Sequence, residues 1–73
     1  MNEMVALTCI PSSAKARLLG IRHTNAKLID YVKIPNIICY GKTCDELYKC
    51  MLNTNEKVVI TITSDKYFVM ERW

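Results

Sequence analysis

The sequence predicts a small α+β domain: an antiparallel β-sheet of about four to six short strands with one α-helix, at about 43–53, packed on one face. The chain has 73 residues, which is the length of a single domain spanning residues 1–73. A capped amphipathic helix lies between strand-like segments, and the chain ends in a strongly β-forming pattern. Hydrophobic residues make up 51% of the chain, with only two glycines and two prolines, so we expect a packed core rather than disorder.

The helix is predicted from its cap and its apolar stripe. Glu46 follows Thr43 by three residues, which is the spacing of a capping box, where each side chain accepts a backbone N–H. Apolar residues then recur at helical spacing. They are Cys44, Leu47, Tyr48, Met51 and Leu52. Such a stripe must be buried, so we expect the helix to lie across the sheet.

Two strands are predicted from short apolar runs. Residues 4–10 show little alternation, which is typical of a strand covered on both faces, and Pro11 ends the run. Residues 37–40 predict a short buried strand, after which Gly41 allows the backbone to turn into the helix.

The segment between these strands fits two structures. Residues 14–20 can form two helical turns or a strand that continues through Arg22. We favour the strand, because a polar turn at 23–25 and a second strand-like run at 26–34 follow it. Two strands around a polar turn predict a β-hairpin.

A second hairpin is predicted at the end of the chain. Residues 58–63 and 66–73 are β-forming, and Ser64-Asp65 is read as a two-residue loop. This loop predicts a register with Ile60 opposite Val69, Thr61 opposite Phe68 and Ile62 opposite Tyr67.

Both faces of the terminal hairpin carry apolar side chains. The set predicted to face the helix is Val58, Ile60, Ile62, Tyr67 and Val69. Because one helix covers only one face of a sheet, the opposite face needs another layer or another chain. We therefore expect it to bind a protein partner, including a second copy in a homodimer. The partner-binding residues are predicted to be Val59, Thr61, Phe68 and Met70.

The charge distribution supports an alternative partner. The formal net charge is +3, and residues 11–33 carry five basic residues against one acidic residue. Lysine and arginine bind phosphates, and a tyrosine can stack on a base, so nucleic acid is the alternative partner. The residues for this site are Lys15, Arg17, Arg22, Lys27, Tyr31 and Lys33.

The sequence predicts no metal site, cofactor or catalytic centre. Cys9, Cys39, Cys44 and Cys50 lack the close pairs of a zinc knuckle, so we expect buried free thiols. A Cys39–Cys44 or Cys9–Cys39 disulfide is the alternative in an oxidising setting or in a hyperthermophile. His23, the single histidine, lies in a polar turn and is expected to be exposed.

The sequence also predicts a cytoplasmic protein that does not enter a membrane. No basic segment precedes the apolar run at 4–10, and no small-residue cleavage site follows it. No apolar stretch approaches the length of a membrane span.

Two short segments lie close together within residues 33–47: Lys33-Ile34-Pro35-Asn36-Ile37 and Tyr40-Gly41-Lys42-Thr43-Cys44-Asp45-Glu46-Leu47. They resemble the strand–turn–helix segment of HicB-type antitoxins. That family has a proline-acid-aliphatic run ahead of a Gly-x-Thr-x-acid-Glu-Ala helix start. The Gly-Cys of the family's longer loop is absent. The resemblance implies a β-β-β-α-β order with one helix, and toxin binding rather than catalysis.

We therefore expect a small non-enzymatic regulatory or inhibitory protein that acts by protein–protein binding and self-associates. We expect a protein of the antitoxin type or of the type of viral or phage accessory proteins. The alternative is a small RNA- or DNA-binding protein that uses residues 15–33.

Overall fold

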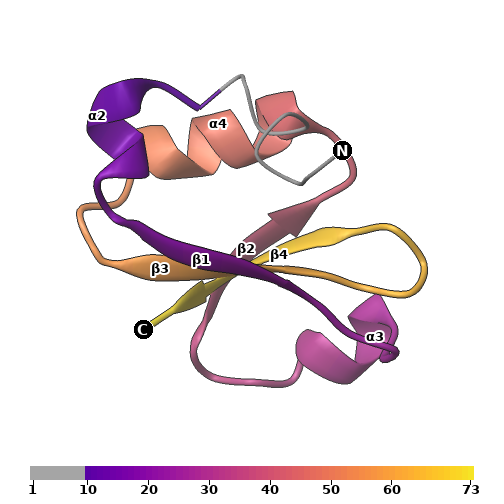
Figure 1. The fold of residues 1–73 in the computed structure, drawn as a ribbon. Helices are drawn as coiled ribbons and strands as arrows, with labels where there is room; N and C mark the ends of the chain where they lie inside the picture. The colour runs from indigo at the N-terminus through magenta and orange to yellow at the C-terminus, as the bar shows by residue number, and fades with distance from the viewer. Residues whose placement is uncertain (1–9) are drawn as a thin grey trace.

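The computed structural model describes residues 10–73 as one four-stranded sheet with short helices on both sides (Figure 1). In chain order the elements are α2 (Ser12–Lys15), β1 (Leu18–His23), α3 (Leu28–Tyr31), β2 (Ile37–Gly41), α4 (Cys44–Leu52), β3 (Val58–Ile62) and β4 (Phe68–Arg72). The α+β fold class is confirmed. The strand predicted at 4–10 lies outside the described residues except for Ile10, which is buried.

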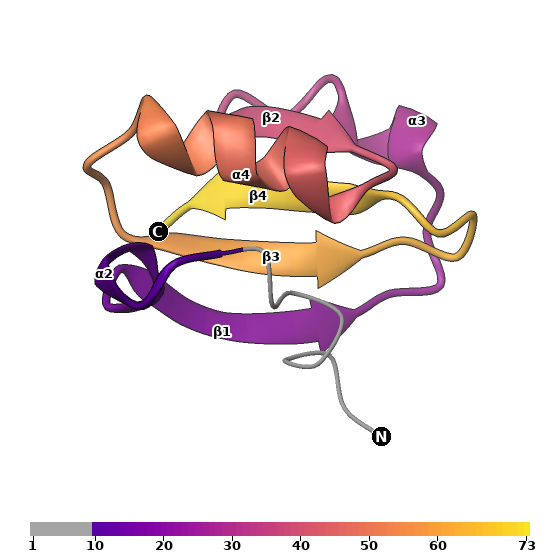
Figure 2. The same ribbon diagram turned by 90° about the horizontal axis from the view of Figure 1, so that it is seen from above.

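The sheet is mixed rather than wholly antiparallel. Its strand order is β1-β3-β4-β2, in which β1 and β3 are parallel while the other two neighbouring pairs are antiparallel (Figure 2). Between β1 and β3 the chain passes through α3, β2 and α4, which is long enough for the crossover that a parallel pair requires. Along residues 10–73 the chain order of the elements is α-β-α-β-α-β-β, which differs from the β-β-β-α-β order implied by the HicB resemblance.

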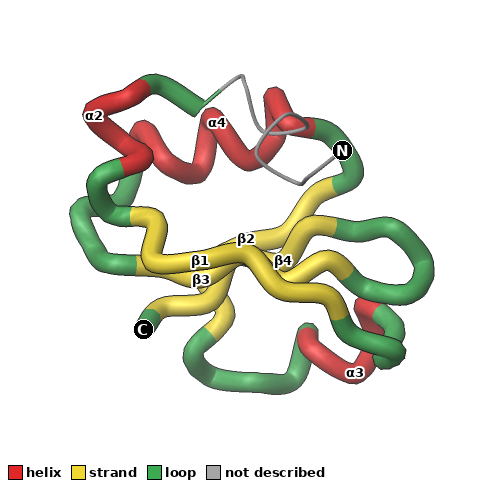
Figure 3. The backbone as a smooth tube through the Cα atoms, viewed as in Figure 1, coloured by secondary structure: helices red, strands yellow, loops and turns green. Residues whose placement is uncertain are grey.

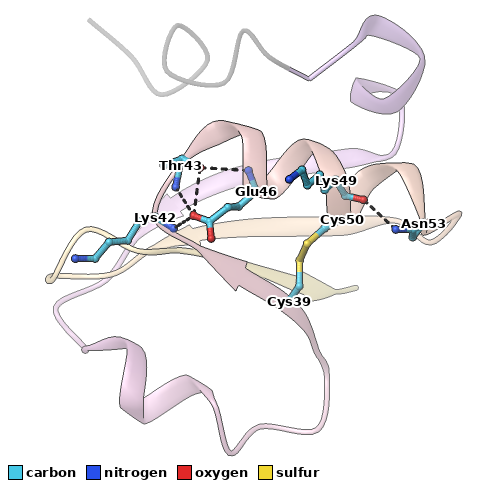
Figure 4. Close-up of a disulfide and its surroundings, with 7 residues drawn as sticks. All are labelled: Cys39, Lys42, Thr43, Glu46, Lys49, Cys50 and Asn53. Carbon is cyan, nitrogen blue, oxygen red and sulfur yellow. Dashed lines mark hydrogen bonds between the residues drawn. A yellow bond between two sulfur atoms is a disulfide. The ribbon is translucent and has the colours of Figure 1, made fainter.

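The predicted helix is confirmed as α4, with Thr43 as its N-cap. The Thr43 hydroxyl oxygen accepts the backbone N–H of Glu46 at 3.3 Å. The Glu46 carboxylate in turn accepts the backbone N–H groups of Lys42 and Thr43 at 2.8 and 3.0 Å (Figure 4). This capping box satisfies donors that have no partner inside a helix, so the local sequence is sufficient to start α4 where it begins.

The core lies between α4 and the sheet. Leu47 and Met51 are one helical turn apart and fully buried. They belong to a cluster with alternate residues of the two central strands, which point to the same side of the sheet. The buried members of this cluster are Ile10, Ala14, Leu47, Met51, Val58, Ile60 and Met70.

The hairpin predicted across residues 14–34 is wrong. Residues 14–20 are divided, because α2 ends at Lys15 and β1 begins at Leu18. The run at 26–34 contains α3 instead of a strand (Figure 3). Its first turn is held by two carboxylates: Asp30 accepts the backbone N–H of Lys27 at 3.0 Å, and Asp65 accepts that of Leu28 at 3.1 Å.

Asp65 lies far along the chain, in the β3–β4 loop. Because this contact is tertiary, the alternating pattern of residues 26–34 gave no sign of it. Strand β1 takes its hydrogen bonds from β3, with Arg22 beside Thr61, and so needs no hairpin partner at 26–34.

The predicted register of the terminal hairpin is wrong by one residue. Ile60 lies opposite Met70, Thr61 opposite Val69 and Ile62 opposite Phe68. The loop has three residues, 64–66, rather than two, because the backbone N–H of Thr63 donates to the carbonyl of Tyr67 at 2.9 Å. The last loop residue, Lys66, has a φ of 67°. A three-residue loop with a left-handed third residue is a common hairpin connection, and it changes which strand residues share a face.

Candidate functional surface

The four predicted partner-binding residues do not share one face of the sheet. Met70 belongs to the core cluster beneath α4, and Phe68 packs against that cluster. Val59 and Thr61 point to the opposite side, where both are buried. The expected apolar face is therefore absent from the described hairpin, and the register explains why: residues of β4 paired with Ile60 and Ile62 face the helix.

The opposite face is covered by the chain itself. Figure 1 shows α3 and the connection to β2 on the side of the sheet away from α4. The backbone N–H of Arg72 donates to the carbonyl of Asn36 at 2.8 Å, which ties this connection to the end of β4. Val69 and Thr61 are fully buried on this side of the sheet. The second layer expected from a partner is thus largely supplied by residues 28–36 of the chain itself.

A polar network lies on this same face. Glu71 is buried, and its Oε2 accepts the Thr61 hydroxyl at 2.6 Å and the Nη2 of Arg22 at 2.8 Å. Arg22 Nε also donates to the Thr61 hydroxyl oxygen at 2.9 Å. The hydrogen bond to Glu71 raises the pKa of Arg22 above its usual value, so the guanidinium stays charged. The network satisfies a buried carboxylate, which would be costly if left unpaired.

The six residues of the nucleic-acid alternative do not form one surface on a hairpin, because that hairpin does not exist. Arg17 donates to the carbonyl of Met51 at 3.3 Å, near the carboxyl end of α4, where a positive charge is favourable. Arg22 is paired with Glu71. Lys15 lies in α2, ahead of β1. Lys27, Tyr31 and Lys33 follow β1, in and around α3. The basic residues are therefore separated by the length of β1.

The three cysteines within the described residues are not free thiols, which corrects the expectation from the sequence for them. Cys39 of β2 and Cys50 of α4 form a disulfide, with Cα atoms 6.7 Å apart (Figure 4). Neither predicted alternative pair is this one. No cysteine within residues 10–73 is a free thiol. The spacing of the residues carried a signal for this pair. Cys39 lies on the face of β2 that points toward the helix, opposite the core residue Met70. Cys50 lies three residues after the buried Leu47, on the side of α4 that faces the sheet.

The amino end of α4 is already occupied by a side chain of the helix. Backbone N–H groups of Lys42 and Thr43 and the Thr43 hydroxyl donate to Glu46, and together they hold the pKa of that carboxyl below its usual value. An external anion would have to displace Glu46 to bind there, so this helix end is a structural cap.

The most exposed apolar side chains near one another in sequence lie around α3. Seven large apolar residues are exposed in the described part of the chain, and Ile29, Val32 and Ile34 are three of them. Ile29 is 65% exposed and Val32 45%. Lys27 and Lys33 flank them and are also exposed. We refer to Lys27, Ile29, Val32 and Lys33 as the α3 surface. This surface was not predicted, because residues 26–34 were expected to form a strand, in which Ile29 and Val32 lie on opposite faces.

The described residues show no arrangement for metal chemistry. Within residues 10–73 no group of three or more His, Cys, Asp or Glu side chains could hold a metal ion. In the same part of the chain, no helix has the length and apolar character needed to cross a bilayer.

Comparison with protein-family models, with curated proteins and with solved structures finds no match to this chain.

Proposed function

We propose that this chain is a non-enzymatic regulatory or inhibitory protein that acts by binding another protein through the α3 surface. The observation that supports this proposal is the exposure of Ile29 in α3 and of Val32 at its C-cap, since Asp65 holds the first turn of this short helix. When a partner removes exposed apolar side chains from water, the free energy of the complex falls by about 25 cal/mol per Å² of apolar area buried. A rigid helix also loses little conformational entropy on binding.

The charges around these side chains define the chemistry of the partner. Lys27 and Lys33 flank Ile29 and Val32, while the one carboxylate of the helix, Asp30, accepts the N–H of Lys27. The surface therefore presents an apolar centre bordered by two lysines, with the carboxylates of Asp30 and Asp65 close to Lys27. An apolar patch with an Asp or Glu side chain opposite Lys33 is its complement, and such a charge pattern mainly accelerates association and sets specificity.

The test is a capture experiment with the immobilised, oxidised chain and an extract of the native host, read by mass spectrometry. We expect one protein to be retained by the wild-type chain and lost with Ile29→Glu/Val32→Glu. Leu52→Glu is the matched control, because Leu52 is 63% exposed on α4 and lies outside the α3 surface. Retention should also weaken as salt is raised.

If the doubly substituted chain retains the same protein as well as the wild type does, the α3 surface is not the binding site. If no protein is retained by both the wild-type chain and the Leu52→Glu control, the proposal of a protein partner fails.

We also infer that the chain works in an oxidising compartment rather than in the cytoplasm. The Cys39–Cys50 disulfide supports this inference, because stable disulfides persist in oxidising compartments and are rare in the cytosol. Acid quenching of host cells, followed by alkylation, measures the redox state directly. We expect Cys39 and Cys50 not to be alkylated. Alkylation of both would show free thiols in the host cell and would contradict the inference of an oxidising compartment.

A further inference from the structure

The two outer strands of the described sheet differ in charge. Strands β1 and β2 are at its two ends. β1 contains Arg22 and a bulge at Leu19, both of which are common protections against pairing with another chain. β2 has a bulge near its start, but then runs regularly from Cys39 to Gly41 beside β4. Residues 34–41 carry no charged side chain at all.

Strand β2 is also held firmly in place. On one side it is paired with β4, and the Cys39–Cys50 disulfide joins it to α4 above the sheet. A fixed strand pays little ordering entropy when another strand pairs with it. Figure 2 shows β2 along the outer side of the sheet, with α4 lying over the sheet.

The exposed side chain of this strand is an aromatic one. Tyr40 is 49% exposed although its strand neighbour Val69 is fully buried. It points to the face away from α4, in the same row as Val69 and Thr61. Within residues 10–73 no strand pairs with the outer edge of β2, and an aromatic ring next to such an edge adds apolar contact area to a strand that pairs there.

We propose that the outer edge of β2 pairs antiparallel with β2 of a second copy of this chain, joining two sheets into one. Identical strands can pair about a two-fold axis, and the absence of charge in β2 means that no like charges face each other across it. The main-chain N–H and C=O groups of the edge supply the hydrogen bonds, and the two Tyr40 side chains lie close to the axis. This dimer is independent of the α3 surface, so either proposal can fail alone.

The experiment is multi-angle light scattering on the purified, oxidised chain across a concentration series. The wild-type chain should approach twice its 8.4 kDa mass at high concentration. Tyr40→Lys should weaken dimerisation by about 30-fold or more, the size of a strong interface residue, because each dimer then receives two edge lysines. Leu19→Lys is the matched control: Leu19 is 46% exposed on the other outer strand, and this variant should dimerise like the wild type.

Amide hydrogen exchange gives a second measurement that needs no variant. Exchange within Ile37–Gly41 should slow as the wild-type concentration rises, while exchange within Leu18–His23 should not change. A monomer at every concentration overturns the proposal. So does a dimer that Leu19→Lys dissociates and Tyr40→Lys leaves intact, because it would place the contact on β1. A folded Tyr40→Lys variant, checked by circular dichroism, that dimerises with wild-type affinity overturns it as well.

Discussion

Removal of the Cys39–Cys50 disulfide should cost a large part of the stability of this domain. The disulfide closes a loop with a sequence separation of 11 residues. In the chain-entropy model, opening a loop of this length restores entropy to the unfolded chain and lowers the free energy of unfolding by about 3 kcal/mol. A domain of this length is stabilised by only about 4 to 11 kcal/mol in total. The double variant Cys39→Ala/Cys50→Ala is therefore expected to be marginally stable.

Urea unfolding followed by circular dichroism measures this effect. The double variant should unfold at a clearly lower urea concentration than the oxidised wild type, with a loss of about 3 kcal/mol. Alanine is used because both cysteines are half-buried and pack against the core cluster, where a serine hydroxyl would add a second cost. Peptide mapping after alkylation in denaturant without reductant is the control, and it should find Cys39 and Cys50 joined.

Two results would refute the reasoning. If both cysteines of the wild type are alkylated in denaturant without reductant, the disulfide does not form in the protein. If the disulfide is mapped but the double variant loses less than about 0.5 kcal/mol, then closing this loop does not stabilise the domain, and the rigidity assigned to β2 loses its support.

The remaining predictions concern backbone positions and carboxylates, and urea unfolding measures each. Gly41→Ala should lower the free energy of unfolding by about 2 kcal/mol, because the added Cβ would lie 2.6 Å from Glu46 Cβ. Gly20→Ala should leave it unchanged or raise it by up to about 1 kcal/mol, since nothing lies within 4 Å of a Cβ there. Equal effects at both glycines would contradict the close contact at Gly41. Lys66→Gly should stabilise by about 1 kcal/mol, because Lys66 adopts a left-handed conformation, and a loss of stability would show that its side chain matters more than its backbone. The pKa values of Glu46 and Asp65 are lowered in the folded chain, so their stabilisation is complete above the unfolded pKa near 4 and is lost as pH falls through the lower, folded pKa. Glu46→Gln and Asp65→Asn should therefore each flatten the loss of stability in acid, and an unchanged pH profile would count against these hydrogen bonds.

The candidate surface could be found only in part from the sequence. The apolar character of Ile29 and Val32 is visible there, but their shared exposure depends on residues 28–31 being helical. An alternating pattern fits a half-buried strand equally well over such a short run. Two contacts hold the helical conformation. The backbone N–H of Lys27 donates to Asp30 within the same turn, whereas that of Leu28 donates to Asp65, which is 37 residues away.

The sequence by itself determined the elements whose stabilising contacts are local. Helix α4 was predicted with its cap because Thr43 and Glu46 hydrogen-bond within one turn, and β3 and β4 were predicted from β-branched and aromatic residues. Tertiary structure decided what depends on distant partners: the parallel pairing of β1 with β3, the conformation of α3 and the partner of Cys39. It also decided the hairpin register, because a left-handed Lys66 adds one residue to the loop and moves Met70 from the expected partner face into the core.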